Sequence, residues 1–188
     1  MDSTRWVELH PEDGFEFDLR YATSNNFLGH IIYDCGRCFL RPDAAKALNA
    51  INRELRTQGY KVKLFDCYRP LSVQWELWEE LPDPNYVADP KKGSMHNRGQ
   101  AVDLTLVNIE TGDELNMGTD FDFFGPKAYH SETKNLSIEI QENRSLLKNT
   151  MIKHGFYPIR TEWWHYSKRD KTWPLFEKKW DCVDSNRN

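Results

Sequence analysis

The sequence from Ser94 to Asp103 is SMHNRGQAVD, and a second informative segment, Glu162 to His165, is EWWH. Two imidazoles and one carboxylate form the ligand set of a catalytic zinc ion that keeps one coordination position open for water. His96, Asp103 and His165 supply that set, which leaves Glu162 as a proton acceptor. A lone histidine or aspartate usually has a structural role, so the prediction of a zinc site depends on the combination.

The residues after Gly99 indicate how Asp103 is carried. Side chains alternate from Gln100 to Val107, with valine and leucine on one face, which is typical of a β-strand. An unpaired carboxylate on such an apolar segment is costly, and a metal ion would compensate its charge. The zinc site is therefore expected on a sheet.

The segment Phe156–Tyr166 is rich in aromatic and β-branched residues and is also expected to be extended, apart from Pro158. Glu162 and His165 are an odd number of positions apart, so a regular strand would point their side chains to opposite faces. We therefore expect a bulge or a strand end that turns one of them toward the metal. Taken alone, the segment favours an aromatic core strand with an incidental histidine.

The rest of the chain predicts a single compact α+β domain over residues 1–188, with a mainly antiparallel central sheet flanked by helices. Apolar residues at helical spacing and bounding prolines and glycines predict helices over residues 42–58, 71–81 and 137–154. A strand is expected over residues 61–67. The three prolines of residues 82–93 predict a loop that leads into the site and shapes a substrate pocket.

Composition argues against nucleic acid and membrane insertion. The net charge is −4 and the basic residues are scattered, so nothing indicates a nucleic-acid partner. No apolar run is long enough to span a bilayer, and the N-terminus has no charged-then-apolar leader. We expect a cytoplasmic protein from the sequence as it stands, or a periplasmic one if a signal peptide has been removed. The oligomeric state stays open.

The four cysteines do not settle the compartment. Cys35 and Cys38 have the two-residue spacing of a redox or zinc motif, but no second such pair follows. Cys67 and Cys182 are too poorly grouped with them for a four-cysteine zinc site. We expect buried or idle thiols, with disulfides left open if the protein is exported.

The pattern Ser94-x-His96-x-x-Gly99-x-Ala101-x-Asp103, followed by Glu162-x-x-His165, resembles the zinc D-alanyl-D-alanine dipeptidases of the vancomycin-resistance type. The wider group includes D-Ala-D-Ala carboxypeptidases, lysostaphin-like endopeptidases and the hedgehog signalling domain. The similarity covers about residues 18–168. It extends to the stretches Asp18–Thr23, Asn26–Gly29, Asp66–Pro70, Asp103–Leu106, Met117–Gly118 and Phe121–Phe123.

The resemblance implies one zinc ion per chain, with the ligands His96, Asp103 and His165. Glu162 matches the catalytic base, and Arg69 matches the arginine that stabilises the tetrahedral intermediate. General chemistry supports these roles, because zinc lowers the pKa of bound water to roughly 7 and an arginine stays charged at any working pH. A surface position for Arg69 is the alternative, although Pro70 restricts Arg69 to an extended conformation after a predicted strand.

The resemblance also implies a substrate, the dipeptide D-Ala-D-Ala, which is hydrolysed to free D-alanine. Asp122 matches the carboxylate that receives the free amino group of the dipeptide, with Tyr21 and Ser94 near the same pocket. Such a carboxylate favours a short substrate over a longer peptide. The alternative for Asp122 is a turn cap among the neighbouring phenylalanines.

Two other functions remain open at this point. One is a D,D- or L,D-carboxypeptidase that trims cell-wall peptides. The other is a non-catalytic binding domain stabilised by zinc. Glu162 and Arg69 argue against the second, because a binding domain needs neither a base nor a fixed cation beside an open metal position.

Overall fold

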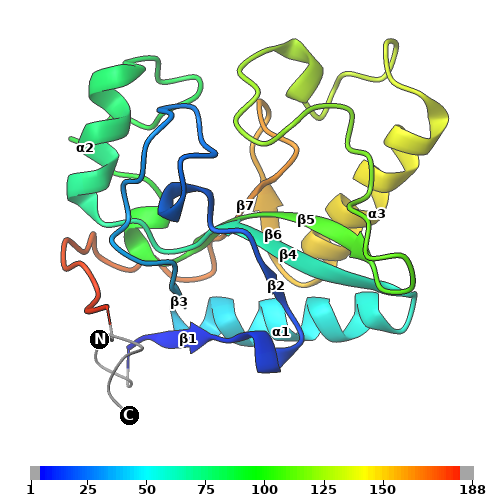
Figure 1. The fold of residues 1–188 in the computed structure, drawn as a ribbon, viewed down its shortest axis with the longest axis horizontal. Helices are drawn as coiled ribbons and strands as arrows, with labels where there is room; N and C mark the ends of the chain where they lie inside the picture. Colours follow the sequence, from blue (N-terminus) through cyan, green and yellow to red (C-terminus); the bar gives the residue numbers. More distant parts are fainter. Residues whose placement is uncertain (1–4, 183–188) are drawn as a thin grey trace.

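The centre of the protein is a five-stranded sheet in the order β2-β4-β5-β7-β6 (Figure 1). The computed structural model describes residues 5–182. Its sheet strands are β2 (Glu16–Phe17), β4 (Tyr60–Asp66), β5 (Ala101–Asn108), β6 (Phe156–Pro158) and β7 (His165–Lys168). β2 runs parallel to β4 and all other neighbours are antiparallel, which confirms the mainly antiparallel sheet of an α+β domain.

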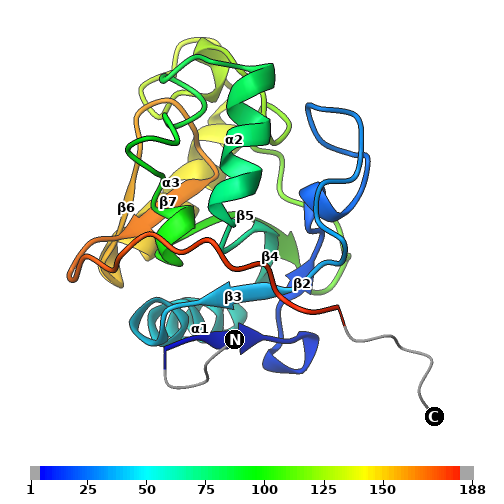
Figure 2. The same cartoon turned by 90° about the vertical axis from the view of Figure 1, so that its left-hand side faces the viewer.

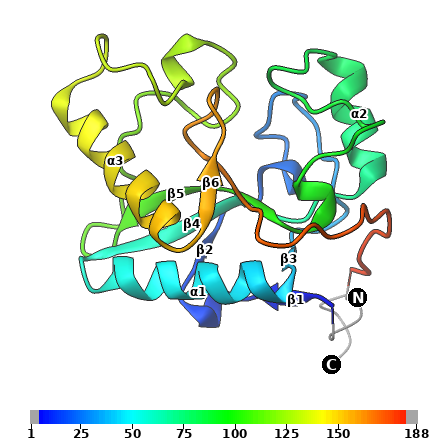
Figure 3. The ribbon, with the colours of Figure 1, turned by 180° about the vertical axis from the view of Figure 1, so that it is seen from behind.

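Residues 5–182 form three α-helices, each within two residues of its predicted ends: α1 (Pro42–Arg56), α2 (Leu71–Glu80) and α3 (Ile138–Lys153). α1 and α3 pack against the sheet. α1 begins at a proline and packs its apolar stripe, which includes Leu48, Ile51 and Leu55, against the sheet at β4 (Figure 3). The Ser137 hydroxyl caps α3 by accepting a hydrogen bond from the Ile140 amide at 3.3 Å. No helix in residues 5–182 has the length and apolar character needed to cross a membrane.

β5 contains the longest run of buried residues in the sheet. Every residue from Ala101 to Val107 is buried, so both faces of the strand are covered. Asp103 is 3% exposed in this apolar setting. The predicted alternation therefore identifies the strand, while the packing of helices and loops on both sides decides that neither face meets water.

The expected single extended segment over residues 156–166 is wrong. β6 and β7 form an antiparallel pair in which Pro158 lies opposite Tyr166, and residues 159–164 connect them. Proline lacks an amide hydrogen and terminates the first strand at the connection. His165 is consequently the first residue of β7, and Glu162 lies in the connection. The strand end that the 162–165 spacing required is confirmed.

The expectation of idle thiols is also wrong. Cys35 pairs with Cys182 and Cys38 pairs with Cys67, with Cα–Cα distances of 5.9 and 5.3 Å. These distances lie in the normal range for disulfides, and the described chain has no free cysteine. The first pair joins positions 147 residues apart, so local spacing could not reveal it.

A second, two-stranded sheet lies beside the C-terminal segment. Its strands, β1 (Val7–Leu9) and β3 (Cys38–Leu40), are antiparallel. After β7, residues 169–182 form no helix or strand and run back past β3 (Figure 2). We call residues 171–182 the C-terminal strap.

Candidate active site

Three side chains predicted as metal ligands meet at the centre of the site. The Nδ1 atom of His165 lies 3.0 Å from Oδ1 of Asp103, and Nε2 of His96 lies 3.3 Å from the same oxygen. The two ring nitrogens are 3.1 Å apart. All three residues are buried, and their donor atoms lie within 4.8 Å of one another. Two imidazole nitrogens and one carboxylate oxygen that converge in this way fit a zinc ion.

Backbone structure explains why these side chains meet. Asp103 and His165 are direct partners in the antiparallel pairing of β5 with β7. His96 comes from a short 3₁₀ turn, His96–Arg98, and its Nδ1 lies 2.6 Å from the main-chain oxygen of Cys67. Because a carbonyl oxygen only accepts, Nδ1 carries the ring hydrogen and Nε2 keeps its lone pair for a metal.

The charge of Asp103 suits a ligand. Burial alone would raise the pKa of this carboxyl, but the neighbouring His96 and His165 outweigh burial and hold the pKa below its usual range. Asp103 is therefore ionised. Burial lowers the pKa of His165, although Asp103 opposes this shift, and the neutral ring is the form that binds a metal.

Glu162 lies beside the cluster but outside it. Its Oε2 is 4.0 Å from Nδ1 of His165, and the residue is 7% exposed. Burial raises the pKa of Glu162, and the negative charges of Asp103 and Asp122 raise it further. A buried carboxylate with a raised pKa is suited to take up a proton near neutral pH.

The connection that carries Glu162 is fixed by its neighbours on both sides. The Trp163 indole donates a hydrogen bond to the Thr119 hydroxyl at 2.8 Å. The Thr161 hydroxyl donates to the main-chain oxygen of Asn85 at 3.1 Å. Glu162 is thus held between the loop before Phe121 and the proline-rich loop of residues 82–93.

Arg69 is buried, at 7% exposure, which excludes a surface position. Its Nε and Nη2 atoms lie 3.0 and 2.8 Å from Oδ2 of Asp66, and its Nη1 donates to Oε1 of Gln74 at 3.0 Å. Nη2 is 3.7 Å from Asp103. Burial alone would lower the pKa of Arg69, but Asp66 reverses this effect and the pKa lies above its usual value. Two N–H groups of the guanidinium remain for a ligand.

Asp66 and Gln74 are functional candidates that the sequence reasoning missed. Asp66 is fully buried, anchors the Arg69 guanidinium, and accepts a hydrogen bond from the Tyr33 hydroxyl at 2.8 Å. A signal was available, because an acid three residues before an arginine at the end of a buried strand has few other partners. Gln74, on α2, carries no comparable signal.

Asp122 points toward the cluster from a loop. Its Oδ2 accepts a hydrogen bond from the Tyr21 hydroxyl at 3.1 Å, a contact across 101 positions of sequence that a turn cap would not make. Among the described residues it is the one non-glycine with positive φ, at 58°. Burial raises the pKa of its carboxyl, and the charge of Asp103 adds to this shift.

Ser94 holds the turn that carries His96. Its hydroxyl accepts a hydrogen bond from the His96 amide at 3.1 Å, and its own amide donates to the Asn97 side chain at 2.6 Å. Both contacts fix the turn that carries His96. The hydroxyl hydrogen of Ser94 is left for a bound molecule.

A cavity of about 250 Å³ joins these groups. Its walls contain all eight residues predicted from the sequence: Tyr21, Arg69, Ser94, His96, Asp103, Asp122, Glu162 and His165. The predicted loop of residues 82–93 contributes to the wall, as expected. Phe124, Ile159 and Arg169 also line the cavity and were not predicted.

Known proteins resemble the chain over most of its length. It is 37% identical to a D-alanyl-D-alanine dipeptidase of Escherichia coli (strain K12), over 98% of this chain and 95% of the relative. It is 34% identical to a D-alanyl-D-alanine dipeptidase of Enterococcus faecium, over 86% of this chain and 89% of the relative.

Two solved structures are more distantly similar. One is VanYB in complex with D-alanine-D-alanine, with a TM-score of 0.47 and 17% identity over 70% of this chain and 72% of that chain. The other is the LdcB LD-carboxypeptidase, with a TM-score of 0.44 and 20% identity over 69% and 59%. The sequence profile of the family Peptidase_M15, described as D-ala-D-ala dipeptidase, matches residues 9–186. The chain therefore belongs to the D-Ala-D-Ala dipeptidase family.

Proposed function

We propose that the protein is a zinc-dependent dipeptidase that hydrolyses D-Ala-D-Ala to two molecules of free D-alanine. The observation that carries the proposal is the cavity itself. It combines a buried His–Asp–His cluster with a buried carboxylate, Glu162, a partly buried carboxylate, Asp122, and a buried arginine, Arg69. A cluster with a structural role alone has no need of these three additional charges. The relatives named as D-alanyl-D-alanine dipeptidases give the substrate class.

In this proposal His96, Asp103 and His165 hold one zinc ion. Zinc supplies a polarised scissile carbonyl and a more acidic water molecule. The protein contributes the His165 ring, whose neutral form burial favours, and the Asp103 carboxylate, whose ionised form the neighbouring histidines favour against the effect of burial.

Glu162 acts as the general base and then as the general acid. Its carboxylate lies next to the cluster without belonging to it, so it can accept a proton from the attacking water. The raised pKa makes the protonated form easier to reach than in an exposed glutamate, and that proton is then delivered to the leaving amine.

Arg69 stabilises the negative charge that develops on the substrate oxygen. Asp66 and Gln74 hold the guanidinium in one orientation before the substrate arrives, so little reorganisation is needed during the reaction. Its two uncommitted N–H groups are the donors for this oxygen.

Asp122 and Tyr21 form the subsite for the free amino group. The Asp122 carboxylate accepts a hydrogen bond from the Tyr21 hydroxyl and is subject to the charge of Asp103, so an ammonium ion offsets an excess of negative charge in the cavity. The cavity is smaller than the roughly 300–1,000 Å³ of sites for drug-sized ligands, which favours a dipeptide over a longer peptide. Ser94 contributes a hydroxyl to the same cavity.

We also place the protein in an oxidising compartment, which corresponds to the periplasmic alternative. Disulfides are rare in reducing cytosol and persist outside it. Two disulfides in a domain of this size support that location. Mass spectrometry of protein taken directly from its native cells, with thiols blocked at lysis, tests the assignment. Four blocked thiols would contradict it.

The function is tested by incubating purified zinc-loaded protein with four substrates and measuring free alanine. The substrates are D-Ala-D-Ala, L-Ala-L-Ala, N-acetyl-D-Ala-D-Ala and a wall pentapeptide that ends in D-Ala-D-Ala. We expect efficient release from the first alone. Efficient cleavage of the acetylated or longer peptide would instead establish a carboxypeptidase, and no cleavage of any substrate would leave a binding domain.

A further inference from the structure

We propose that the C-terminal strap positions the turn that carries His96, and that the Cys35–Cys182 disulfide locks the strap in place. The strap would thereby set how tightly the cluster retains its metal, which makes its residues positioning residues. The claim that the strap slows the loss of metal rests on the zinc site proposed above. The claim that the strap orders the turn around His96 is independent of that site.

The strap binds the residues that directly follow His96. The Phe176 amide donates a hydrogen bond to the main-chain oxygen of Asn97 at 3.0 Å. The Arg98 guanidinium donates to the main-chain oxygen of Trp173 at 2.7 Å. The Trp173 amide donates to the Gln100 side chain at 3.0 Å. Three of the four residues after the metal ligand are therefore tied to the strap.

The strap also packs against the residue before Ser94. A Cβ atom added at Gly93 would overlap the Leu175 side chain, so the two segments are in close contact. Gly93 and Ser94 both line the cavity. The strap therefore contacts the chain both before and after His96.

The strap also contacts Tyr68, the residue after Cys67, which is the hydrogen-bond partner of the His96 ring. The Tyr68 hydroxyl lies 3.0 and 3.1 Å from the main-chain oxygens of Phe176 and Lys178 and donates to them. Tyr68 follows Cys67, whose main-chain oxygen accepts from the His96 ring. The strap therefore contacts the segments on both sides of this ligand.

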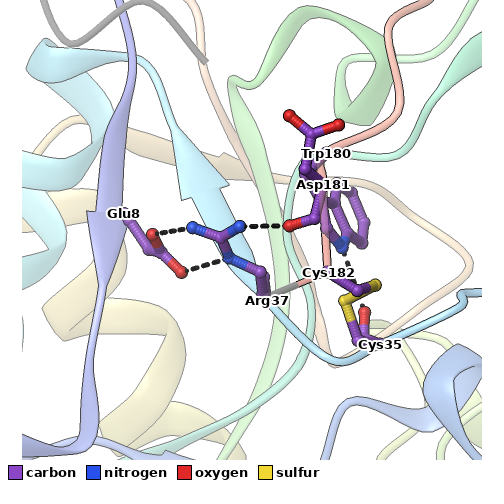
Figure 4. Close-up of a disulfide and its surroundings, with 6 residues drawn as sticks. All are labelled: Glu8, Cys35, Arg37, Trp180, Asp181 and Cys182. Carbon is purple, nitrogen blue, oxygen red and sulfur yellow. Dashed lines mark hydrogen bonds and ion pairs between the residues drawn. A yellow bond between two sulfur atoms is a disulfide. The ribbon is translucent and has the colours of Figure 1, made fainter. Parts of the chain in front are cut away.

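The far end of the strap is fastened by a separate group of contacts (Figure 4). The Trp180 ring is buried against Tyr33 and Phe39, and its indole donates to the main-chain oxygen of Cys35 at 3.1 Å. Arg37 bridges the main-chain oxygen of Asp181, at 2.5 Å, and both carboxylate oxygens of Glu8. The disulfide to Cys182 closes this group.

The covalent lock matters because the strap has no secondary structure of its own. A segment without helix or strand hydrogen bonds keeps one conformation only through its contacts with neighbouring segments. A disulfide keeps the strap at a high effective concentration beside its docking surface, so the hydrogen bonds to residues 97–100 reform faster than they open.

The main test uses the double variant Cys35→Ser/Cys182→Ser, which leaves Cys38 and Cys67 able to pair. The first measurement is hydrogen exchange of the amides of residues 95–100 in metal-free protein. The second is the rate at which a chelator removes zinc from the loaded protein. We expect faster exchange in this turn and zinc release that is roughly 10-fold faster, the scale for losing an outer partner of a ligand.

A milder pair of variants keeps the test decisive if the double variant does not fold. Leu175→Ala removes the contact with Gly93, whereas Glu177→Ala changes an exposed strap residue and is the matched control. We expect faster exchange and faster zinc release for Leu175→Ala alone.

The outcomes separate the two proposals. If either readout is unchanged in both the double variant and Leu175→Ala, the strap proposal is overturned. If the wild-type protein binds no zinc, the proposed function fails, and the exchange of the metal-free protein still decides whether the strap holds the turn.

Discussion

The two halves of the site are positioned in different ways. Asp103 and His165 are partners in the hydrogen-bonded pairing of β5 with β7, so the backbone ladder sets their separation. Asp122 and Glu162 lie outside the strands, and individual side-chain contacts from Tyr21, Trp163 and Thr161 hold their segments. The sheet half is therefore robust to single changes around it, whereas the loop half depends on a few specific neighbours.

The largest expected effect follows from removing a ligand of the metal cluster. His165→Ala should lower zinc affinity by more than the roughly 10–100-fold that loss of an outer partner costs, and activity should fall to the uncatalysed background. Zinc content measured by mass spectrometry after dialysis checks this expectation. His10→Ala, at an exposed histidine, is the control. A full zinc complement in His165→Ala would show that His165 is not a zinc ligand.

In the loop half, turnover should fall without loss of metal. Glu162→Gln keeps the shape of the side chain but cannot accept a proton, so we expect kcat to drop about 100- to 10,000-fold. The zinc content should match the wild type, because Glu162 lies outside the ligand cluster. Turnover close to the wild-type rate would assign Glu162 a structural role.

Arg69 connects the two halves, since its guanidinium lies near Asp103 and faces the cavity. Lysine cannot reproduce the paired contacts with Asp66 and Gln74, so Arg69→Lys should reduce kcat by about 100-fold, the lower range for losing an oxyanion donor. Steady-state kinetics with the dipeptide measure the effect. A change confined to KM would show that Arg69 binds substrate rather than the developing charge.

A smaller effect is expected at Asp122, in the proposed subsite for the amino group. Asp122→Asn removes the charge but keeps an oxygen for the Tyr21 hydroxyl. We expect kcat/KM for D-Ala-D-Ala to fall roughly 30-fold, which corresponds to a loss of about 2 kcal/mol of transition-state stabilisation. Zinc content should not change. Tyr21→Phe serves as the matched comparison, because it removes the partner and leaves the carboxylate. Equal activity of Asp122→Asn and wild type would favour a structural role for this residue.

The smallest effect concerns acid stability of the loops. Burial, followed by the charges of Lys148 and Arg144, lowers the pKa of His130 to about 4 from an ordinary 6.5. The unfolded chain therefore binds a proton at His130 more readily than the folded protein does. The contribution of His130 to stability is fully present above pH 6.5 and is lost as the pH falls toward 4. Between pH 7 and 5 we expect the free energy of unfolding of the wild type, measured in urea, to fall relative to that of His130→Gln by an amount on the order of 1 kcal/mol. An identical pH profile in that variant would contradict the assignment.

Local patterns predicted the sheet half well. Alternation around Asp103 identified β5, and the odd spacing of Glu162 and His165 correctly required a strand end, because both follow from the geometry of a single strand. The hairpin of β6 and β7 was missed because aromatic residues continue through its connection. The disulfides and the anchoring of Arg69 by Gln74 were missed because they depend on how distant segments pack, which no local period encodes.

Asp122 carries a consequence for protein engineering. Its φ of 58° suits glycine, and its position near Asp103 suits a neutral side chain, so each local condition favours a different residue. Selection for heat resistance in the absence of substrate would therefore replace Asp122 early. A thermostable library screened only for folding would lose the residue that we propose to bind the amino group of the dipeptide, and Asp122 should be held constant in such work.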